Sequence, residues 1–168
     1  IIYNSELLHL YGKLDKEIKI HIKFDTGMNR YGFDASELDK LVADLLKYPK
    51  LKIQSICSHL AASDNIEKDS FTNDQFQVFE NLSNSFSKRF NQLIDRHILN
   101  TNGVLRFPNK EYEMVRLGIG LYGLSTDNNL QQVSTLKSVI SQVRIIKEGS
   151  KVGYNASFLA KEDMIIGV

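Results

Sequence analysis

HIKFDTGMNRYGF, residues 21–33, joins the end of a strand pattern to a polar loop. From Ile18 to Phe24, apolar residues alternate with polar ones, which is the period of a β-strand. Asp25 then breaks the pattern, and the glycines after it permit backbone angles that other residues avoid. Arg30 is therefore predicted on a tight loop just beyond a strand, and we interpret this loop as the rim of an active site.

An amphipathic helix is predicted after the loop, because leucine and valine recur at helical spacing between Leu38 and Leu46. Asp34 precedes this segment and is a favourable N-cap. The first unit of the fold is thus strand, loop and helix.

The same order of elements recurs along the chain. Further strands are predicted at 51–58, 97–99 and 114–117, each ending in a polar or glycine-containing segment. Between the first two of these, Asn73 is the predicted N-cap of a helix with a core-facing apolar stripe. The stripe consists of Phe76, Phe79, Leu82, Phe86 and Phe90.

Elements that alternate in this way predict an α/β fold with parallel strands and right-handed crossovers, either a doubly wound sheet or a (β/α)₈ barrel. In a barrel the chemistry lies at the carboxyl ends of the strands. Arg30, His59, Thr101 and Arg116 each follow or end a predicted strand, so they are the first candidates for a site.

The composition argues for small-molecule chemistry in a soluble protein. The 168 residues include 21 Lys and Arg against 20 Asp and Glu, and no block of like charge suggests nucleic acid or a membrane surface as partner. Apolar runs are far shorter than the ~20 residues of a membrane span. Cys57 is the only cysteine, so no intrachain disulfide forms, and a cytoplasmic location is expected. No metal site is predicted.

A second domain is expected to begin after Leu124. Residues 125–129 are predicted to be a linker, and the alternation from Val139 to Ile145 predicts a strand, with a turn at 147–150. We therefore divide the chain into domains 1–124 and 125–168. It lacks an initiator methionine and ends within an apolar run, so a fragment of a longer protein is expected.

Residues 21–33 resemble the signature segment of the pyridoxal-phosphate-dependent alanine racemases, "H-x-K-x-D-T-G-M-x-R-x-G". Four further segments resemble motifs of this family, in the family's order. They are SHLAASD at 58–64, LNTNGVLRFP at 99–108, MVRLGIGLYG at 114–123 and GSKVGYNASF at 149–158.

The resemblance implies the C-terminal half of a (β/α)₈ TIM-type barrel, followed by the beginning of a C-terminal β domain. A complete barrel takes ~250 residues, and only four strand units are predicted here. Nothing in the chain resembles the family's motif "V-x-K-A-N-A-Y-G-H-G", which carries the Schiff-base lysine.

The resemblance also implies roles for individual residues. Arg116 resembles the arginine that faces the pyridine nitrogen of the cofactor, and His59 the histidine that hydrogen-bonds that arginine. Arg30 resembles the residue that contacts the cofactor's phenolic oxygen and the substrate carboxylate. Lys23 matches a lysine that is carbamylated in many members of the family and orients this arginine. The alternative is that Lys23 is an unmodified, solvated lysine. His21 and His97 have no such support and are taken as structural.

The cofactor phosphate is expected to bind to Thr101, where the family has serine, and to the amides of Gly118 and Ile119. Tyr154 resembles a tyrosine that serves as one of two acid/base groups and reaches the active site of the partner subunit. Phe158 stands where many members have a second tyrosine.

The function implied is interconversion of L- and D-alanine for peptidoglycan, by a two-base mechanism with pyridoxal 5'-phosphate in a homodimer. The isolated chain is expected to be inactive. Two alternatives remain: a racemase for another amino acid, or a non-catalytic racemase-like module fused to or paired with a cell-wall enzyme.

Overall fold

The computed structural model describes residues 1–124 and 130–168, so the predicted linker 125–129 lies outside the described residues. Contacts divide the chain into two units, Ile1–Val133 and Ser134–Val168. The helices of the first unit are α1 (Ser5–Gly12), α2 (Leu38–Leu46), α3 (Asp69–Phe90) and α4 (Thr101–Arg106). Its strands are β1 (Ile18–Lys23), β2 (Leu51–Cys57) and β3 (Asp95–His97).

The sheet of the first unit is parallel, in the order β1-β2-β3. This confirms the prediction of parallel strands, although β3 lies two residues earlier than expected. A fourth strand at 114–117 was predicted wrongly, because no strand forms there. Met114 N donates to Arg96 O, and Arg116 N donates to Leu99 O. The donors are two residues apart and the acceptors three, so the register changes by one residue and no regular ladder forms.

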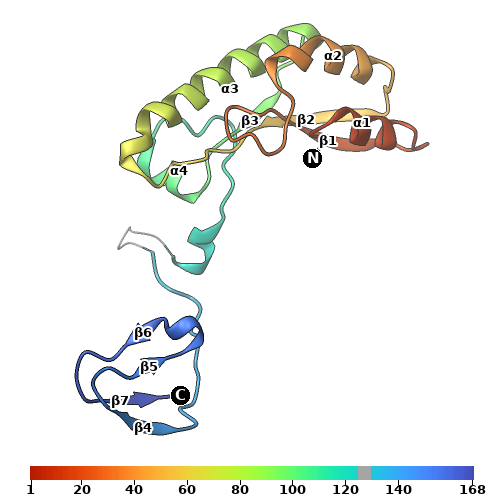
Figure 1. Cartoon of the computed structure of the whole chain (residues 1–168). Coiled ribbons are helices and arrows are strands. Elements are labelled where there is room, and N and C mark those ends of the chain that lie inside the picture. Colours follow the sequence, from red (N-terminus) through yellow and green to blue (C-terminus); the bar gives the residue numbers. More distant parts are fainter. Residues whose placement is uncertain (125–129) are drawn as a thin grey trace. The chain divides into compact units, whose positions relative to one another are not determined.

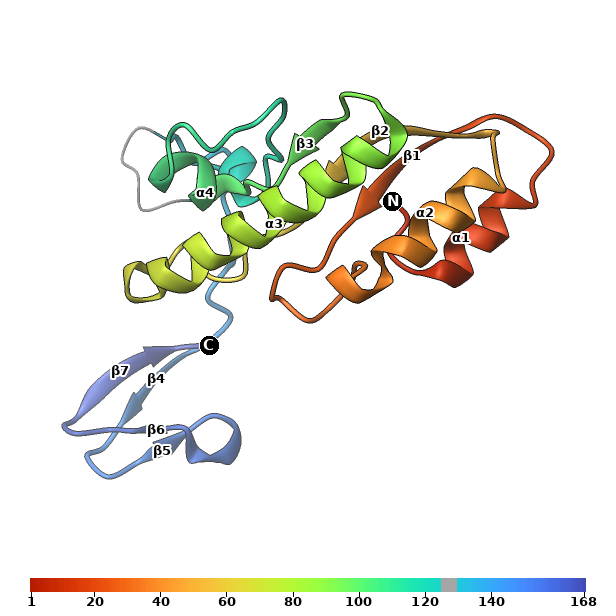
Figure 2. The same cartoon turned by 90° about the horizontal axis from the view of Figure 1, so that it is seen from above.

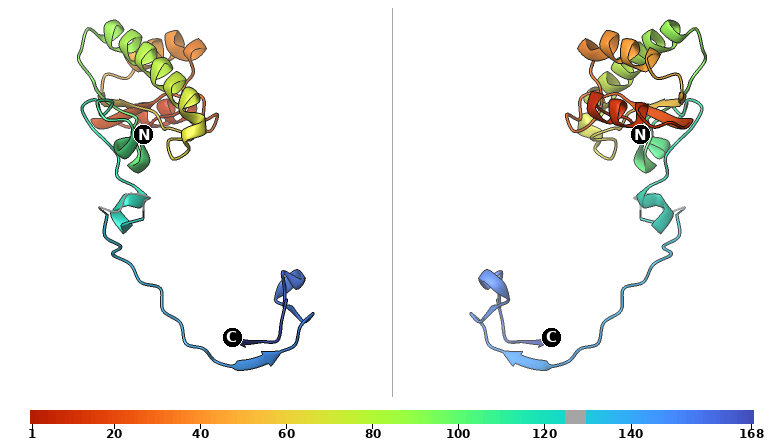
Figure 3. Two further views of the ribbon diagram at one scale, coloured as in Figure 1. Left: turned by 90° about the vertical axis from the view of Figure 1, so that its left-hand side faces the viewer. Right: turned by 90° about the vertical axis from the view of Figure 1, so that its right-hand side faces the viewer.

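Helices α2 and α3 lie over one face of this sheet (Figures 1 and 2), and Figure 3 shows the same layer from two sides. The aromatic stripe of α3 faces the strands: the rings of Phe24 and Phe86 pack edge to face, with centroids 5.7 Å apart. Phe76, Phe79 and Phe86 are almost fully buried. The predicted core stripe is confirmed, and the core lies between the sheet and these helices.

The caps of two helices differ in how well the sequence predicts them. Asp34 caps the 3₁₀ turn that leads into α2, and Glu37 completes a capping box. Asn73, by contrast, lies inside α3 and is not its cap. Asn65 begins this segment instead, because its side chain accepts a hydrogen bond from Glu67 N at 2.9 Å, and a 3₁₀ turn then continues directly into the helix.

The second unit contains two antiparallel strand pairs. β4 (Val143–Ile146) pairs with β7 (Met164–Gly167), and β5 (Lys151–Val152) pairs with β6 (Phe158–Leu159). The predicted turn at 147–150 is confirmed by the hydrogen bond from Ser150 N to Lys147 O. Among the described residues, no helix is long and apolar enough to cross a membrane.

Candidate functional site

The loop after β1 is folded around the carboxylate of Asp25. Its Oδ1 accepts hydrogen bonds from Gly27 N at 2.8 Å and Asn29 N at 3.1 Å, and its Oδ2 accepts one from Arg30 N at 3.1 Å. The loop closes where Phe33 N donates to Lys23 O. The side chain of Arg30 is exposed, with Cζ 6.0 Å from the centroid of the Tyr31 ring. Arg30 thus has a fixed backbone and a guanidinium that reaches solvent at the end of β1.

Arg116 lies at the carboxyl ends of β2 and β3, although it is not itself in a strand. Its guanidinium donates to the carbonyl oxygens of His97 at 3.1 Å, Ile98 at 3.3 Å and Ser58. Burial lowers the pKa of Arg116 from its ordinary value, but a guanidinium remains a cation at any working pH. The strand ends therefore hold a fixed, half-buried positive charge.

Two histidines accept hydrogen bonds from this guanidinium. Nη2 of Arg116 lies 3.2 Å from Nδ1 of His59, and Nη1 contacts Nδ1 of His97. Burial, followed by the charge of Arg116, lowers the pKa of His59 and lowers that of His97 to about 4. Because arginine only donates, each Nδ1 must carry a lone pair, and both imidazoles are neutral near pH 7.

The sequence reasoning placed His59 beside Arg116 and treated His97 as structural, so it missed this second contact. His97 lies in β3 in register with Cys57, which in turn is in register with Lys23. These three residues form a row across the sheet. Burial lowers the pKa of Lys23 and raises that of Cys57, so both groups are displaced toward their neutral forms.

Thr101 organises a second part of the site at the start of α4. Its buried hydroxyl oxygen accepts hydrogen bonds from Gly118 N at 3.2 Å and Gly120 N at 3.0 Å. The predicted grouping of Thr101 with Gly118 and Ile119 is thus close in space, and Gly120 belongs to it as well. The Asn100 side chain accepts from Gly103 N, which caps α4.

Gln75 of α3 braces the loops that carry the site, and sequence reasoning missed it. Its Nε2 donates to His59 O at 3.0 Å and to Thr26 Oγ1 at 3.2 Å, and its Oε1 accepts from Ala61 N at 2.9 Å. Gln75 is fully buried. Its position next to Phe76 on the apolar face was the available signal, because a buried amide must find several partners.

Tyr154 belongs to the second unit and is 99% exposed there. It begins a 3₁₀ turn after Gly153, whose φ of +78° is in the region that favours glycine. Asn155 and Ala156 also have positive φ values, so the turn that begins at Tyr154 has a strained backbone.

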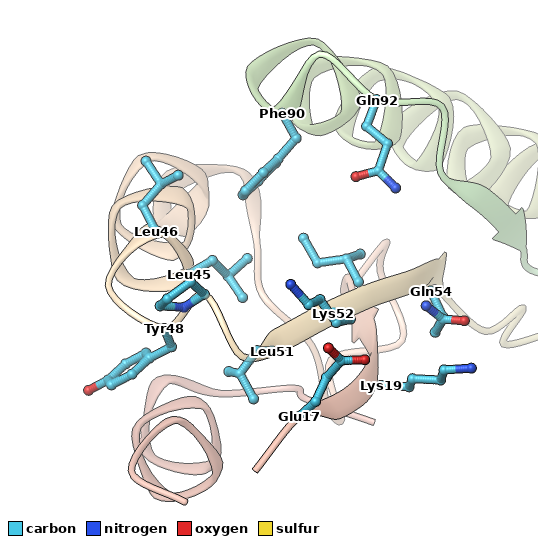
Figure 4. A pocket seen from close by; sticks show the side chains of 12 residues that line it. Glu17, Lys19, Leu45, Leu46, Tyr48, Leu51, Lys52, Gln54, Phe90 and Gln92 are labelled. Carbon is cyan, nitrogen blue, oxygen red and sulfur yellow. The ribbon is translucent and has the colours of Figure 1, made fainter. Parts of the chain in front are cut away.

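A cavity of about 470 Å³ lies at the opposite end of the sheet (Figure 4). Its lining includes Glu17, Lys19 and Lys52, near the amino ends of β1 and β2, together with Tyr48 and Phe90. It contains none of the predicted site residues, so we place the candidate site at the carboxyl ends of the strands.

Comparison with known proteins matches residues 3–126 to the family described as "Alanine racemase, N-terminal domain". Residues 3–126 therefore correspond to the N-terminal domain of this family and not to its second half. It is 32% identical over 173 residues to an alanine racemase of Clostridium kluyveri, covering 98% of this chain and 44% of that protein. It is 36% identical over 166 residues to an alanine racemase of Prochlorococcus marinus, covering 92% of this chain and 42% of that protein.

Solved structures agree with this match. An alanine racemase from Bartonella henselae with covalently bound pyridoxal phosphate has a TM-score of 0.71 and 27% identity, covering 97% of this chain and 45% of that one. An alanine racemase from Bacillus anthracis with bound L-Ala-P has a TM-score of 0.70 and 26% identity. The match covers 99% of this chain and 46% of that one. The chain spans about half the length of these relatives. On the family match over residues 3–126, the chain belongs to the alanine racemase family.

Proposed function

We propose that the full-length protein is an alanine racemase that uses pyridoxal 5'-phosphate, and that this chain supplies part of its cofactor-binding surface. The observation that carries the proposal is the guanidinium of Arg116, held by three carbonyl oxygens and two neutral histidines at the carboxyl ends of parallel strands. A guanidinium held in one position in this way is better suited to hydrogen-bond an aromatic ring nitrogen than to bind an anion from solvent.

The residues present fit the cofactor. Pyridoxal phosphate needs a hydrogen-bonding partner at its ring nitrogen and several donors around its phosphate. Arg116 supplies the first. For the second, Thr101 can donate its hydroxyl proton while its oxygen accepts from Gly118 N and Gly120 N, and the Ile119 amide follows Gly118 in the same turn. At Gly118 an added Cβ would find only Thr101 Oγ1 within 4 Å, at 3.8 Å, so the backbone is open to a ligand there.

When bound, the cofactor supplies an electron-withdrawing ring that stabilises negative charge at the substrate Cα. Arg116 donates a hydrogen bond to the ring nitrogen but keeps its own proton, which limits that stabilisation. Arg30 binds the substrate carboxylate with its forked donors, and its reach into solvent beyond β1 suits this task. Tyr154 holds and moves the proton at Cα on one face.

The finer architecture is part of the proposal. Residues 1–124 form part of the (β/α)₈ barrel of the N-terminal domain, and residues 125–168 begin the β domain. The boundary between the two contact units, at 133–134, supports this division. Tyr154 is proposed to act in the partner subunit of a cytoplasmic homodimer that makes D-alanine for peptidoglycan, and its full exposure supports a contact outside its own unit.

The test is racemisation by the full-length protein purified with pyridoxal phosphate. We expect formation of D-alanine from L-alanine, and a kcat roughly 100-fold lower in Arg116→Gln, because one fixed donor to a developing charge is lost. The matched control is Arg96→Gln, which removes an arginine that pairs with Glu113 and lies next to His97 in sequence. Its kcat should stay within about two-fold of the wild type.

Two results would contradict the proposal. If the full-length protein binds no pyridoxal phosphate, the cofactor assignment fails. If it binds the cofactor and racemises serine or lysine in preference to alanine, the reaction class stands and the substrate is wrong.

A further inference from the structure

A chain of hydrogen bonds leads from Arg116 into the first unit and ends at a residue that the proposed reaction does not use. Nη1 of Arg116 contacts Nδ1 of His97. Nε2 of His97 lies 2.8 Å from Oγ of Ser55, and the same Oγ lies 2.6 Å from Nδ1 of His21. Four side chains, from a loop and from all three strands, are therefore connected.

An irregularity in the sheet brings the last two together. From Ile18 to Ile20, β1 pairs with β2 in one register, and a shift between Ile20 and His21 then places His21 opposite Ser55. Without that shift, His21 would face Gln54. The imidazole rings of His21 and His97 lie 6.0 Å apart, with the serine hydroxyl between their nitrogens.

The direction of each hydrogen bond in this chain follows from the first. Arginine can only donate, so Nδ1 of His97 accepts and the ring proton of neutral His97 is on Nε2. That N–H donates to Ser55 Oγ, because this oxygen is its partner. The serine has a single proton of its own, which then points to His21 Nδ1. Every donor along Arg116, His97, Ser55 and His21 is oriented one way.

We propose that Ser55 and His21 are positioning residues for Arg116, because they hold His97 in the tautomer that presents its Nδ1 lone pair to the guanidinium. The inference depends on the proposed function for its consequence, which is a correctly aimed Arg116. Its structural basis is independent, since Ser55 is fully buried and His97 is 6% exposed, so water does not readily replace either partner.

The chain also opposes protonation of His21. A charged His21 would donate from Nδ1 to Ser55 Oγ, which already receives the His97 proton, and the serine proton would lose its acceptor. Burial acts in the same direction, since it lowers the pKa of His21. Arg116 is the charged group that faces His97, and it disfavours a second positive charge there.

The experiment observes the ring nitrogens of histidine by NMR in the full-length protein, deuterated and labelled with ¹⁵N only in its histidine rings. Signals are assigned with His21→Gln and His97→Gln. We expect both histidines to carry their proton on Nε2 at neutral pH. In Ser55→Ala, His21 should become a mixture of tautomers and its pKa should rise, because its neutral form loses a hydrogen bond.

Ser83→Ala is the matched control, because Ser83 is an equally buried serine on α3 that donates to Glu80 O. It should leave both histidine signals unchanged. Ser55→Thr keeps the hydroxyl and should restore the tautomer of His21. For racemisation we expect a kcat about five-fold lower in Ser55→Ala with KM little changed, the effect of about one hydrogen bond.

The inference is overturned if His21 carries its proton on Nδ1 in the wild type, or if Ser55→Ala leaves the His21 nitrogen signals as they were. Because the NMR measurement needs no substrate, it separates this inference from the proposed function. If the protein shows the expected tautomers but makes no D-alanine, the hydrogen-bond chain stands and the racemase assignment is wrong.

Discussion

Gly32 closes the loop that carries Arg30, and no other residue fits there. Its φ is +128°, and an added Cβ would lie 2.4 Å from Asp25 N and 2.5 Å from the carbonyl carbon of Phe24. Both atoms belong to the backbone of the segment after β1, which cannot move without breaking the Asp25–Phe33 hydrogen bond. We expect Gly32→Ala to cost about 3 kcal/mol of stability or more, measured by urea denaturation.

Gly27 provides the comparison for this substitution, because it also has a positive φ, of +123°. Its added Cβ would lie 3.2 Å from the ring of Phe71, a side chain that can shift, and at an ordinary contact distance of 3.8 Å from Gln75 Cγ. Gly27→Ala should therefore cost only about 1–2 kcal/mol. Equal losses at the two positions would show that φ alone, and not the contact with the backbone, sets the cost.

Lys23 is placed for the proposed carbamylation. Burial lowers its pKa, which increases the fraction of neutral amine, and only the neutral amine attacks carbon dioxide. The reaction joins the amine nitrogen to the carbon of CO₂ and releases one proton, so occupancy should rise with pH. In ¹³C-bicarbonate, NMR of the full-length protein should show a carbamate signal that disappears in Lys23→Arg. Lys19→Arg, four residues earlier on the same strand, should retain it.

At the scale of the element, α3 shows how far a periodic pattern can be trusted. Its apolar stripe was predictable because burial repeats with the helical period, whereas its start was not. Asn65 and Asn73 are the same residue type, and only the turn formed by 66–68 decides which of them begins the segment. A cap depends on local backbone geometry, and the hydrophobic pattern of a helix gives no information about that geometry.

The stripe of α3 also makes the strongest stability prediction. Phe79 is fully buried, and its ring packs edge to face on Tyr112 with centroids 5.5 Å apart. Phe79→Ala should cost about 3–5 kcal/mol, because the cavity it leaves is enclosed by the sheet. The neighbouring Val78 is 39% exposed, so Val78→Ala should cost under about 1 kcal/mol. Urea denaturation followed by circular dichroism measures both, and similar losses would mean that α3 does not pack on the core as described.

At the scale of the whole molecule, the candidate site was only partly predictable from sequence. Arg116 and His59 lie in recognisable motifs, so their proximity could be expected. The link from His97 through Ser55 to His21 could not, because it depends on the register shift between Ile20 and His21. Pairing between strands is a property of the folded sheet, and a shift of one residue changes which side chains meet.

This buried cluster also sets how stability depends on pH. His97 has an ordinary pKa of about 6.5 when unfolded and a pKa of about 4 in the folded protein. Between these values the unfolded state binds more protons, so the contribution of His97 is complete above pH 6.5 and is lost as the pH falls toward 4. The loss amounts to on the order of 3 kcal/mol. Urea midpoints of the full-length protein across this range should fall more steeply in the wild type than in His97→Gln.

Leu82→Ala separates this effect from a general loss of stability. Leu82 is buried in α3 and has no titratable group, so its substitution should lower the midpoint by the same amount at every pH. For His97→Gln, the difference between its urea midpoint and that of the wild type should instead become smaller as the pH falls, because the neutral amide has no proton to gain. Curves for wild type and His97→Gln that stay parallel from pH 7.5 to 4 would show that burial and Arg116 do not hold His97 neutral. The direction assigned to the hydrogen bonds beyond His97 would then be wrong as well.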